Sequence, residues 1–291
     1  MSQLVIRHYA QPAARRHLWL GVVMAIVALA FGIEQSIAWF AAHPMAAKGL
    51  QASLLAGLAT GLGAIPVLFL RRPSEHLMAP MLGLAGGMML AASLFSLLVP
   101  AVQMVAASTA PWWLGLATAS ALLAGAAVMQ RLDRRTPHAH VEGVEDSGHQ
   151  PRVALVVAAI ALHNVPEGLA VGVAAAAGAD HGMSLGIAIQ NVPEGWIVAS
   201  AMITLGAAPW RAALIALGTG LVEPVGGLFG VIATTVAGAA LPLALAAAAG
   251  AMLWVVSHEL IPASHRPGRE TAGTAGLLAG FAVMTTLAVG L

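Results

Sequence analysis

The hexapeptide HNVPEG at residues 163–168 lies inside an apolar stretch, and a near copy, QNVPEG, follows at residues 190–195 inside the next one. Counted from the ends of these stretches, both copies fall near the middle of neighbouring helices that we expect to be antiparallel. The first residue of each copy, His163 or Gln190, lies four positions before the glutamate and projects from the same helix face. The repeat therefore predicts two facing helices with polar centres, as in an inverted repeat.

The proline and glutamate of each copy suit a cation site. Pro166 and Pro193 each lack a backbone donor, which frees the carbonyl four residues earlier and kinks the helix. Lys and Arg occur in the predicted spans only near the ends, although a central Asp costs about 2.5 to 3.5 kcal/mol on one membrane-insertion scale. The partner of Glu167 and Glu194 must therefore come from outside the chain, as a proton or a metal cation.

A third carboxylate, Glu223, is expected at the same depth in a later span. Together with Asn164, Asn191 and the residues above, it forms a ligand set that suits Zn²⁺, Fe²⁺, Mn²⁺ or Cd²⁺. Cysteine is absent, which excludes thiolate ligands. Glu167 and Glu194 could bridge two ions, and loss of Glu223 should then weaken one of two binding events.

The composition predicts an all-α integral membrane protein. The 291 residues are 59% hydrophobic and 9% charged, whereas soluble domains carry about 25% charged residues. Because about 20 apolar residues cross a bilayer, the apolar runs predict nine transmembrane helices. They lie at 18–41, 50–70, 77–105, 112–131, 153–178, 183–205, 209–236, 241–262 and 271–290. No basic patch with interleaved aromatics suggests nucleic-acid binding.

The basic residues predict the topology. All of them except Lys48 lie in the N-terminal tail or in every second loop, which the positive-inside rule assigns to the cytoplasm. We expect a cytoplasmic tail at 1–17, an extra N-terminal span at 18–41, and one transport domain at 50–291 that ends outside. The first span could instead be a signal segment. The composition favours a bacterial inner membrane, with the C-terminus in the periplasm.

One hydrophilic stretch, 132–152, is expected to form a cytoplasmic loop. Its three histidines, His138, His140 and His149, stand among acidic residues and suit loose metal capture. Their spacing fixes no geometry, and a flexible solvated linker is the alternative.

Two weaker signals lie elsewhere. Met89 occupies the middle of its span, although a methionine at helical spacing is more often a core residue than a ligand. His258 and Glu259, followed by His265, end the eighth span at the cytoplasmic side. They form either a solvated helix end or a relay of ligands that leads an ion into the cytoplasm.

The sequence resembles the Zrt-/Irt-like (ZIP) metal transporters, in their prokaryotic branch with an extra N-terminal span. The motifs at 163–168 and 190–195 carry the resemblance, and so do GMMLAAS at 87–93, LVEPVGG at 221–227 and SHELIP at 257–262. It implies an eight-helix bundle, often a homodimer, whose first and last three helices are related by an inverted repeat around the central pair. It also implies metal flow into the cytoplasm.

The resemblance also implies site residues. The transport-site ligands would be Met89, His163, Glu167, Gln190 and Glu194. An adjacent second site would use Asn164, Glu167, Asn191, Glu194 and Glu223. His258, Glu259 and His265 would line the cytoplasmic exit, and Ser96 the entrance. Asn191 departs from the family pattern, in which an Asp stands here, and so lowers the negative charge of the second site.

Two other classes of function remain open from the residues alone. One is a membrane metalloenzyme, although the chain has no HExxH motif and no Cys nucleophile. The other is a metal sensor, which would bind without flux. In a transporter, the central site would be exposed to each side in turn, and binding should weaken as the pH falls because protons compete for its ligands.

Overall fold

The computed structural model describes residues 24, 31, 34–35, 37–69, 75–107, 112–135, 149–176, 181–236 and 240–290. Within these residues every regular element is a helix, which confirms the predicted all-α class. Most of the predicted span 18–41 lies outside the described residues. So do His138 and His140 of the predicted capture loop.

The described residues form helices in the following order along the chain. Their bounds are α2 (Pro44–Ala64), η1 (Ile65–Leu68), α3 (Glu75–Ala91), η2 (Ala92–Leu98), α4 (Val99–Ala107), α5 (Trp112–Arg135), α6 (His149–Ala176), α7 (His181–Thr204), α8 (Pro209–Gly220), α9 (Glu223–Val236), α10 (Leu241–Val255), η4 (Val256–Leu260), α11 (Ile261–Ser264) and α12 (Glu270–Gly290). Pro44 and Pro209 open α2 and α8, where a missing backbone donor costs nothing.

Six helical stretches among the described residues are long and apolar enough to cross a membrane. They are Pro44–Leu68, His76–Ala107, Trp112–Leu132, Pro209–Thr234, Leu241–Ser264 and Glu270–Ala288. The helices with the repeated motif, α6 and α7, are not among these six stretches. The number of nine spans therefore stays a prediction.

Several predicted boundaries differ from the structure. The helix expected at 50–70 begins earlier, at Pro44. α5 runs to Arg135 and α6 begins at His149, so both helices extend into the stretch expected as a loop. The span expected at 209–236 is two helices, because the chain leaves the helix at residues 221–222.

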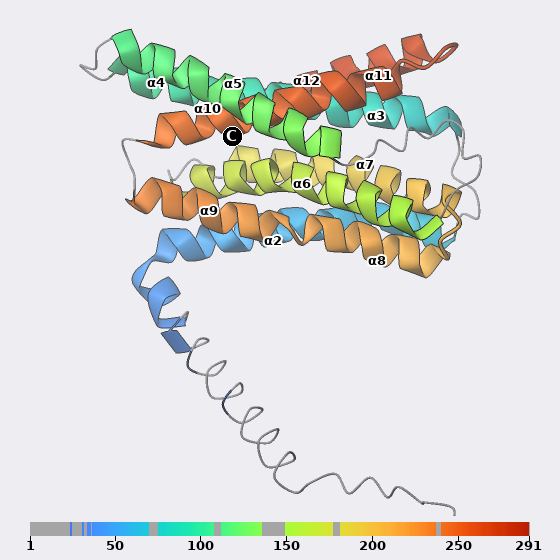
Figure 1. Ribbon diagram of the computed structural model, residues 1–291, viewed down its shortest axis with the longest axis horizontal. Coiled ribbons are helices and arrows are strands. Elements are labelled where there is room, and N and C mark those ends of the chain that lie inside the picture. Colours follow the sequence, from blue (N-terminus) through green and yellow to red (C-terminus); the bar gives the residue numbers. More distant parts are fainter. Residues whose placement is uncertain are drawn as a thin grey trace, which may run out of the picture.

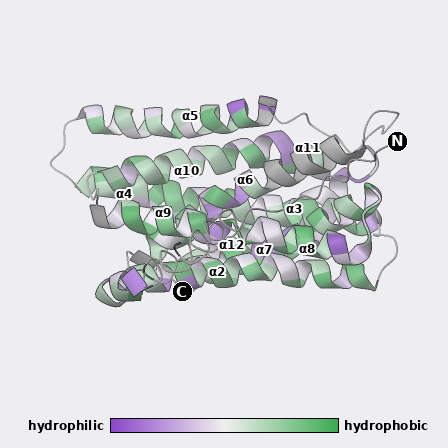
Figure 2. Ribbon diagram, turned by 60° about the horizontal axis from the view of Figure 1, so that its bottom comes forward, coloured by the Kyte–Doolittle hydropathy of each residue, from purple (hydrophilic) through white to green (hydrophobic). Residues whose placement is uncertain are grey.

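The helices form two layers (Figure 1). One layer holds α3, α4, α5, α10, α11 and α12, and the other holds α2, α6, α7, α8 and α9. Within the first layer α3 packs along α12 and α5 along α10, and within the second α6 packs along α9 and α2 along α7. This is the pairing that an inverted repeat produces. Figure 2 shows hydrophobic residues over much of the outer helices, with hydrophilic ones near the middle of the bundle.

Glycines bring the paired helices into backbone contact. A Cβ on Gly87 of α3 would lie 2.0 Å from the carbonyl oxygen of Leu277 on α12, and one on Gly250 of α10 would lie 1.9 Å from that of Leu122 on α5. At Gly186 of α7, which faces α12 in the other layer, the nearest atom is the side-chain sulfur of Met284. The paired helices thus touch through backbone atoms, whereas this contact between layers is made by a flexible side chain.

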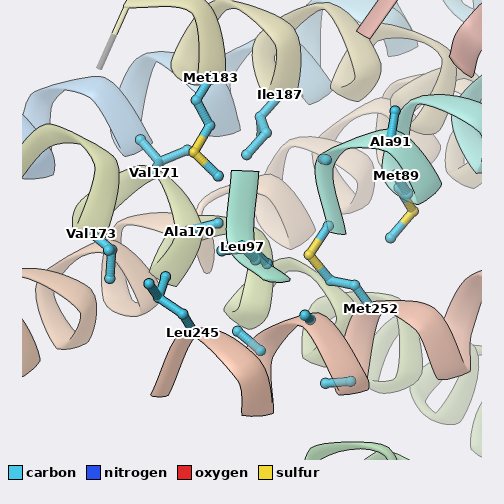
Figure 3. Packing of buried hydrophobic residues seen from close by; sticks show 14 of the residues in the cluster. Met89, Ala91, Leu97, Ala170, Val171, Val173, Met183, Ile187, Leu245 and Met252 are labelled. Carbon is cyan, nitrogen blue, oxygen red and sulfur yellow. The ribbon is translucent and has the colours of Figure 1, made fainter. Parts of the chain in front are cut away.

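An apolar cluster joins the two layers (Figure 3). Leu97, Leu245 and Met252 come from the first layer, and Val171 and Ile187 come from the second. All five side chains are buried. Met183 of α7 belongs to the same cluster, so unbranched methionine side chains, which adapt to irregular gaps, lie on both sides of the boundary.

Candidate metal centre

The last residue of each motif copy sets how closely the helices meet. A Cβ on Gly168 of α6 would lie 1.9 Å from the carbonyl oxygen of Glu223 on α9, and one on Gly195 of α7 would lie 1.8 Å from that of Thr60 on α2. Any side chain there would collide with backbone, so only glycine fits. No role was predicted for these glycines from the sequence. Their function is to bring α9 and α2 against the polar centres of α6 and α7.

The two copies meet through their polar side chains. Glu167 and Gln190 are fully buried, and the Gln190 amide nitrogen donates to Glu167 Oε1 at 2.7 Å. This bond ties the glutamate of α6 to the first residue of the α7 motif. The predicted facing of the two copies is therefore present in the structure.

His163 makes a different contact, across the boundary between the layers. Its Nε2 atom lies 3.3 Å from Glu259 Oε1, which belongs to η4. A residue predicted for the central site thus touches a residue predicted for the cytoplasmic exit.

Asn191 joins three helices. Its amide nitrogen donates to Glu223 Oε1 on α9 at 2.5 Å and to the carbonyl oxygen of Ala56 on α2 at 2.7 Å. No sequence signal marks Ala56, since its contribution is a backbone oxygen brought close by the packing of α2 against α7.

Glu223 sits at a helix start, not in the middle of a continuous span as predicted. α8 ends at Gly220, the amide of Val222 bonds to the carbonyl of Thr219, and α9 begins at Glu223. The positive end of the α9 dipole stabilises a carboxylate in its first turn. Pro224, which favours a first helical turn, was the available sequence signal for this break.

Several polar atoms at the centre remain unpaired among the described residues. They are both side-chain polar atoms of Asn164 and one oxygen each of Glu167, Gln190, Asn191 and Glu223. A buried polar atom without a partner costs free energy. Such a group of oxygens, acceptors by nature, is suited to receive a cation.

Glu194 is half-buried and interacts electrostatically with the other charged groups. Glu167 and Glu223 both have it as a charged neighbour, and so does His163. Even so, no three His, Asp or Glu side chains of the described residues converge as a ready-made metal site. Glu167, Glu223 and His163 instead make hydrogen bonds or contacts with Gln190, Asn191 and Glu259.

The remaining predicted residues lie in the first layer or its connections. Met89 is buried in α3, within the apolar cluster of Figure 3. Ser96 is partly buried in η2. His258 lies in η4 with its ring centroid 5.0 Å from that of Trp254. His149, in contrast, is the first residue of α6 in the second layer, so it is helical although it lies in the stretch expected as a loop.

His265 is held by hydrogen bonds. Its Nδ1 atom lies 2.9 Å from the carbonyl oxygen of Ile261, and its Nε2 atom lies 2.9 Å from the hydroxyl of Thr274 on α12. An ion that leaves past His265 would have to replace one of these contacts.

Two π-helical segments were not predicted. η2 (Ala92–Leu98) interrupts the α3–α4 stretch, and η4 (Val256–Leu260) interrupts the α10–α11 stretch. Ser96 lies in the first, and His258 and Glu259 lie in the second. Such segments often mark functional sites, and these two occupy corresponding places in the two halves of the layer.

This chain is similar to known zinc transporters. A family model described as ZIP zinc transporter matches residues 130–288. The chain is 46% identical to the zinc transporter GufA of Myxococcus xanthus over 247 residues, which cover 82% of this chain and 97% of the relative. It is 46% identical to the zinc transporter ZIPB of Bordetella bronchiseptica over 240 residues, 79% of this chain and 76% of the relative. Human zinc transporter ZIP11 is 38% identical over 149 residues, 48% of this chain and 44% of that protein.

Proposed function

Because this chain belongs to the family of ZIP zinc transporters, we propose that it carries zinc ions through a membrane into the cytoplasm. The chain is a multi-pass membrane protein of a transporter family, so family membership decides against the membrane metalloenzyme. We extend the proposal to Cd²⁺, Fe²⁺ and Mn²⁺, because nitrogen and carboxylate ligands accept all of these ions.

The buried polar cluster supports this function most directly. Glu167, Gln190, Asn191 and Glu223 are fully buried in a largely apolar bundle, and each has an oxygen without a hydrogen-bond partner among the described residues. Buried ionisable groups in membrane helices mark ion pathways. A cation that enters this cluster satisfies the unpaired oxygens and balances the carboxylates.

We assign the transported ion to Met89, His163, Glu167, Gln190 and Glu194. In the structure the Gln190 amide nitrogen faces Glu167. An ion bound there replaces that nitrogen, and the Gln190 amide turns its oxygen to the ion. His163 likewise exchanges its contact with Glu259 for a bond to the ion. The ligands proposed for a second ion, Asn164, Asn191 and Glu223, are treated in the next subsection.

Movement of one layer against the other would expose the site to each side in turn. Backbone contacts at glycines hold α6 to α9 and α2 to α7, so the second layer moves as a unit. The boundary between layers carries methionines such as Met183, Met252 and Met284, which can adapt to a shifted neighbour. The contact between His163 and Glu259 crosses this boundary, so ion binding at His163 and layer position are linked.

Residues outside the centre would line the path of the ion through the protein. Ser96 would line the entrance, and His258, Glu259 and His265 the exit to the cytoplasm. The histidines His138, His140 and His149 would capture ions loosely at that side. We further propose nine spans in a bacterial inner membrane, a cytoplasmic N-terminus, a periplasmic C-terminus and a homodimeric assembly.

Metal uptake into proteoliposomes tests the function. Purified wild-type protein should give saturable Zn²⁺ uptake, with Cd²⁺, Fe²⁺ and Mn²⁺ compared under the same conditions. His163→Ala and Glu167→Ala should each lower the rate at least about tenfold, because even residues outside the ligand shell of a metal alter its binding by 10- to 100-fold.

Glu34→Gln serves as the matched control. This glutamate is exposed and lies outside the cluster, so its loss should leave uptake unchanged. Zinc binding by folded wild-type protein with no flux above that of empty liposomes would reject transport in favour of the sensor.

A further inference from the structure

The amide nitrogen of Asn191 occupies an unusual position for a proposed metal ligand. It lies between Glu223 Oε1, at 2.5 Å, and the carbonyl oxygen of Ala56, at 2.7 Å. The backbone carbonyl can only accept a hydrogen bond, so the atom facing it must be the nitrogen of the amide. The orientation of the Asn191 side chain is therefore fixed by chemistry.

A metal ion between the same two oxygens would need nearly the same place. Zinc–oxygen bonds are about 2.0 to 2.2 Å long. The nitrogen lies only a few tenths of an ångström farther from each oxygen than an ion would. Its N–H groups are the positive end of the amide dipole, and a hydrogen bond to a carboxylate is about twice as strong as one between neutral groups. The amide thus fills the position of a cation.

The corresponding residue of the other motif copy behaves differently. Asn164 is fully buried, yet neither its amide nitrogen nor its oxygen has a partner among the described residues. On Asn191 and Glu223, by contrast, each side chain keeps one unpaired oxygen among those residues, Asn191 Oδ1 and Glu223 Oε2, because the amide nitrogen pairs with Glu223 Oε1 and Ala56. With the amide nitrogen in the place of an ion, these two oxygens by themselves do not make a zinc site, which takes four ligands.

We propose that the Asn191 amide takes the place of a second metal ion, so that the chain holds a single zinc ion at its centre. Asn191 is then a positioning residue that fixes Glu223 between α2, α7 and α9, not a metal ligand. This inference rests on the proposed zinc site around His163 and Glu167, and it limits each transport cycle to one central ion.

Zinc stoichiometry tests the inference. Purified protein is dialysed to equilibrium against saturating zinc, and the bound metal is counted by mass spectrometry. The same count on Glu167→Ala gives the zinc held elsewhere, for example at the exit histidines, and is subtracted. The wild-type protein should retain one central ion. Asn191→Asp removes the amide and adds a carboxylate, and should retain two.

Asn164→Asp is the matched control, because it adds the same charge but leaves the Asn191 bridge intact. Its central count should stay at one. A count of two in the wild type, or one in a folded Asn191→Asp variant, would overturn the inference and leave the zinc site standing. A gain in both variants would overturn it too, since charge alone would then be sufficient.

No difference between wild type and Glu167→Ala would reject the central site itself, and with it the proposed function. If Asn191→Asp does not fold, the wild-type count still decides between one ion and two.

Discussion

The two copies of the repeated motif have nearly the same sequence but different surroundings. In the α6 copy, His163 contacts Glu259 in the other layer, and Asn164 has no partner among the described residues. In the α7 copy, Gln190 and Asn191 both donate to glutamates of their own layer. The α6 copy thus contacts the other layer and keeps an unpaired amide, whereas the α7 copy is hydrogen-bonded inside its own layer.

This difference indicates that a sequence repeat need not give two equal metal sites. The backbone frame is the same, since Gly168 and Gly195 each meet a backbone carbonyl of the partner helix. The copies differ at the first position, which is the imidazole of His163 in one and the amide of Gln190 in the other. They also differ in the residues that each copy contacts. Substitutions at matched positions can therefore separate what the frame contributes from what the side chains contribute.

The largest effect is expected at the shared frame. Gly168→Ala and Gly195→Ala would each place a Cβ less than 2.0 Å from a backbone oxygen, and relief requires the helices to separate. We expect each to destabilise the protein by about 3 kcal/mol, the upper part of the range for overpacking. The melting temperature in detergent should fall strongly and by similar amounts for the two copies.

Gly218→Ala is the control for this comparison. No heavy atom of the described residues lies within 4 Å of the position its Cβ would take. Since alanine is the better helix former by about 1 kcal/mol, the melting temperature should stay or rise. A wild-type melting temperature for Gly168→Ala would mean that α6 and α9 do not touch at this point.

The sequence predicted the frame better than the contacts within it. Apolar length and the repeat predicted helices around a polar centre, because bilayer thickness and helix periodicity act locally. The break before Glu223 was missed, since a Glu-Pro pair fits a kinked helix as well as a new helix start. The π-helical segments were missed because a π turn leaves no periodicity in so short a stretch.

Side-chain pairing was beyond the sequence for another reason. Residues with metal-binding chemistry, such as Glu167 and Gln190, also form hydrogen bonds with each other when no ion is present. Whether Asn191 binds an ion or replaces one depends on the carbonyl of Ala56, which lies far away along the chain. Distances between helices determine such contacts, and a single sequence contains no distances.

A smaller effect, on zinc affinity, is expected from substitutions at the first positions of the two copies. His163→Ala removes an imidazole ligand and leaves Glu259 without this contact, so zinc affinity should fall about 100-fold. Gln190→Ala removes a neutral amide oxygen, a weaker ligand, and should lower affinity about tenfold; both values lie within the range known for changes around metal sites. Isothermal titration of the purified variants measures the two dissociation constants. Equal losses would contradict the asymmetry between the copies.

The smallest expected effect is a change in how steeply the zinc affinity depends on pH. Zinc binds an imidazole only after its proton has left, so each proton released on binding makes the affinity fall about tenfold per pH unit as the pH decreases. His163→Gln gives the α6 copy the same first residue as the α7 copy and keeps a neutral ligand. As the pH decreases, the zinc affinity of this variant should therefore fall less steeply than that of the wild type. The carboxylates keep their own competition with protons, so some slope should remain. Titrations at a series of pH values measure both slopes, and identical slopes would remove His163 from the ligands of the ion.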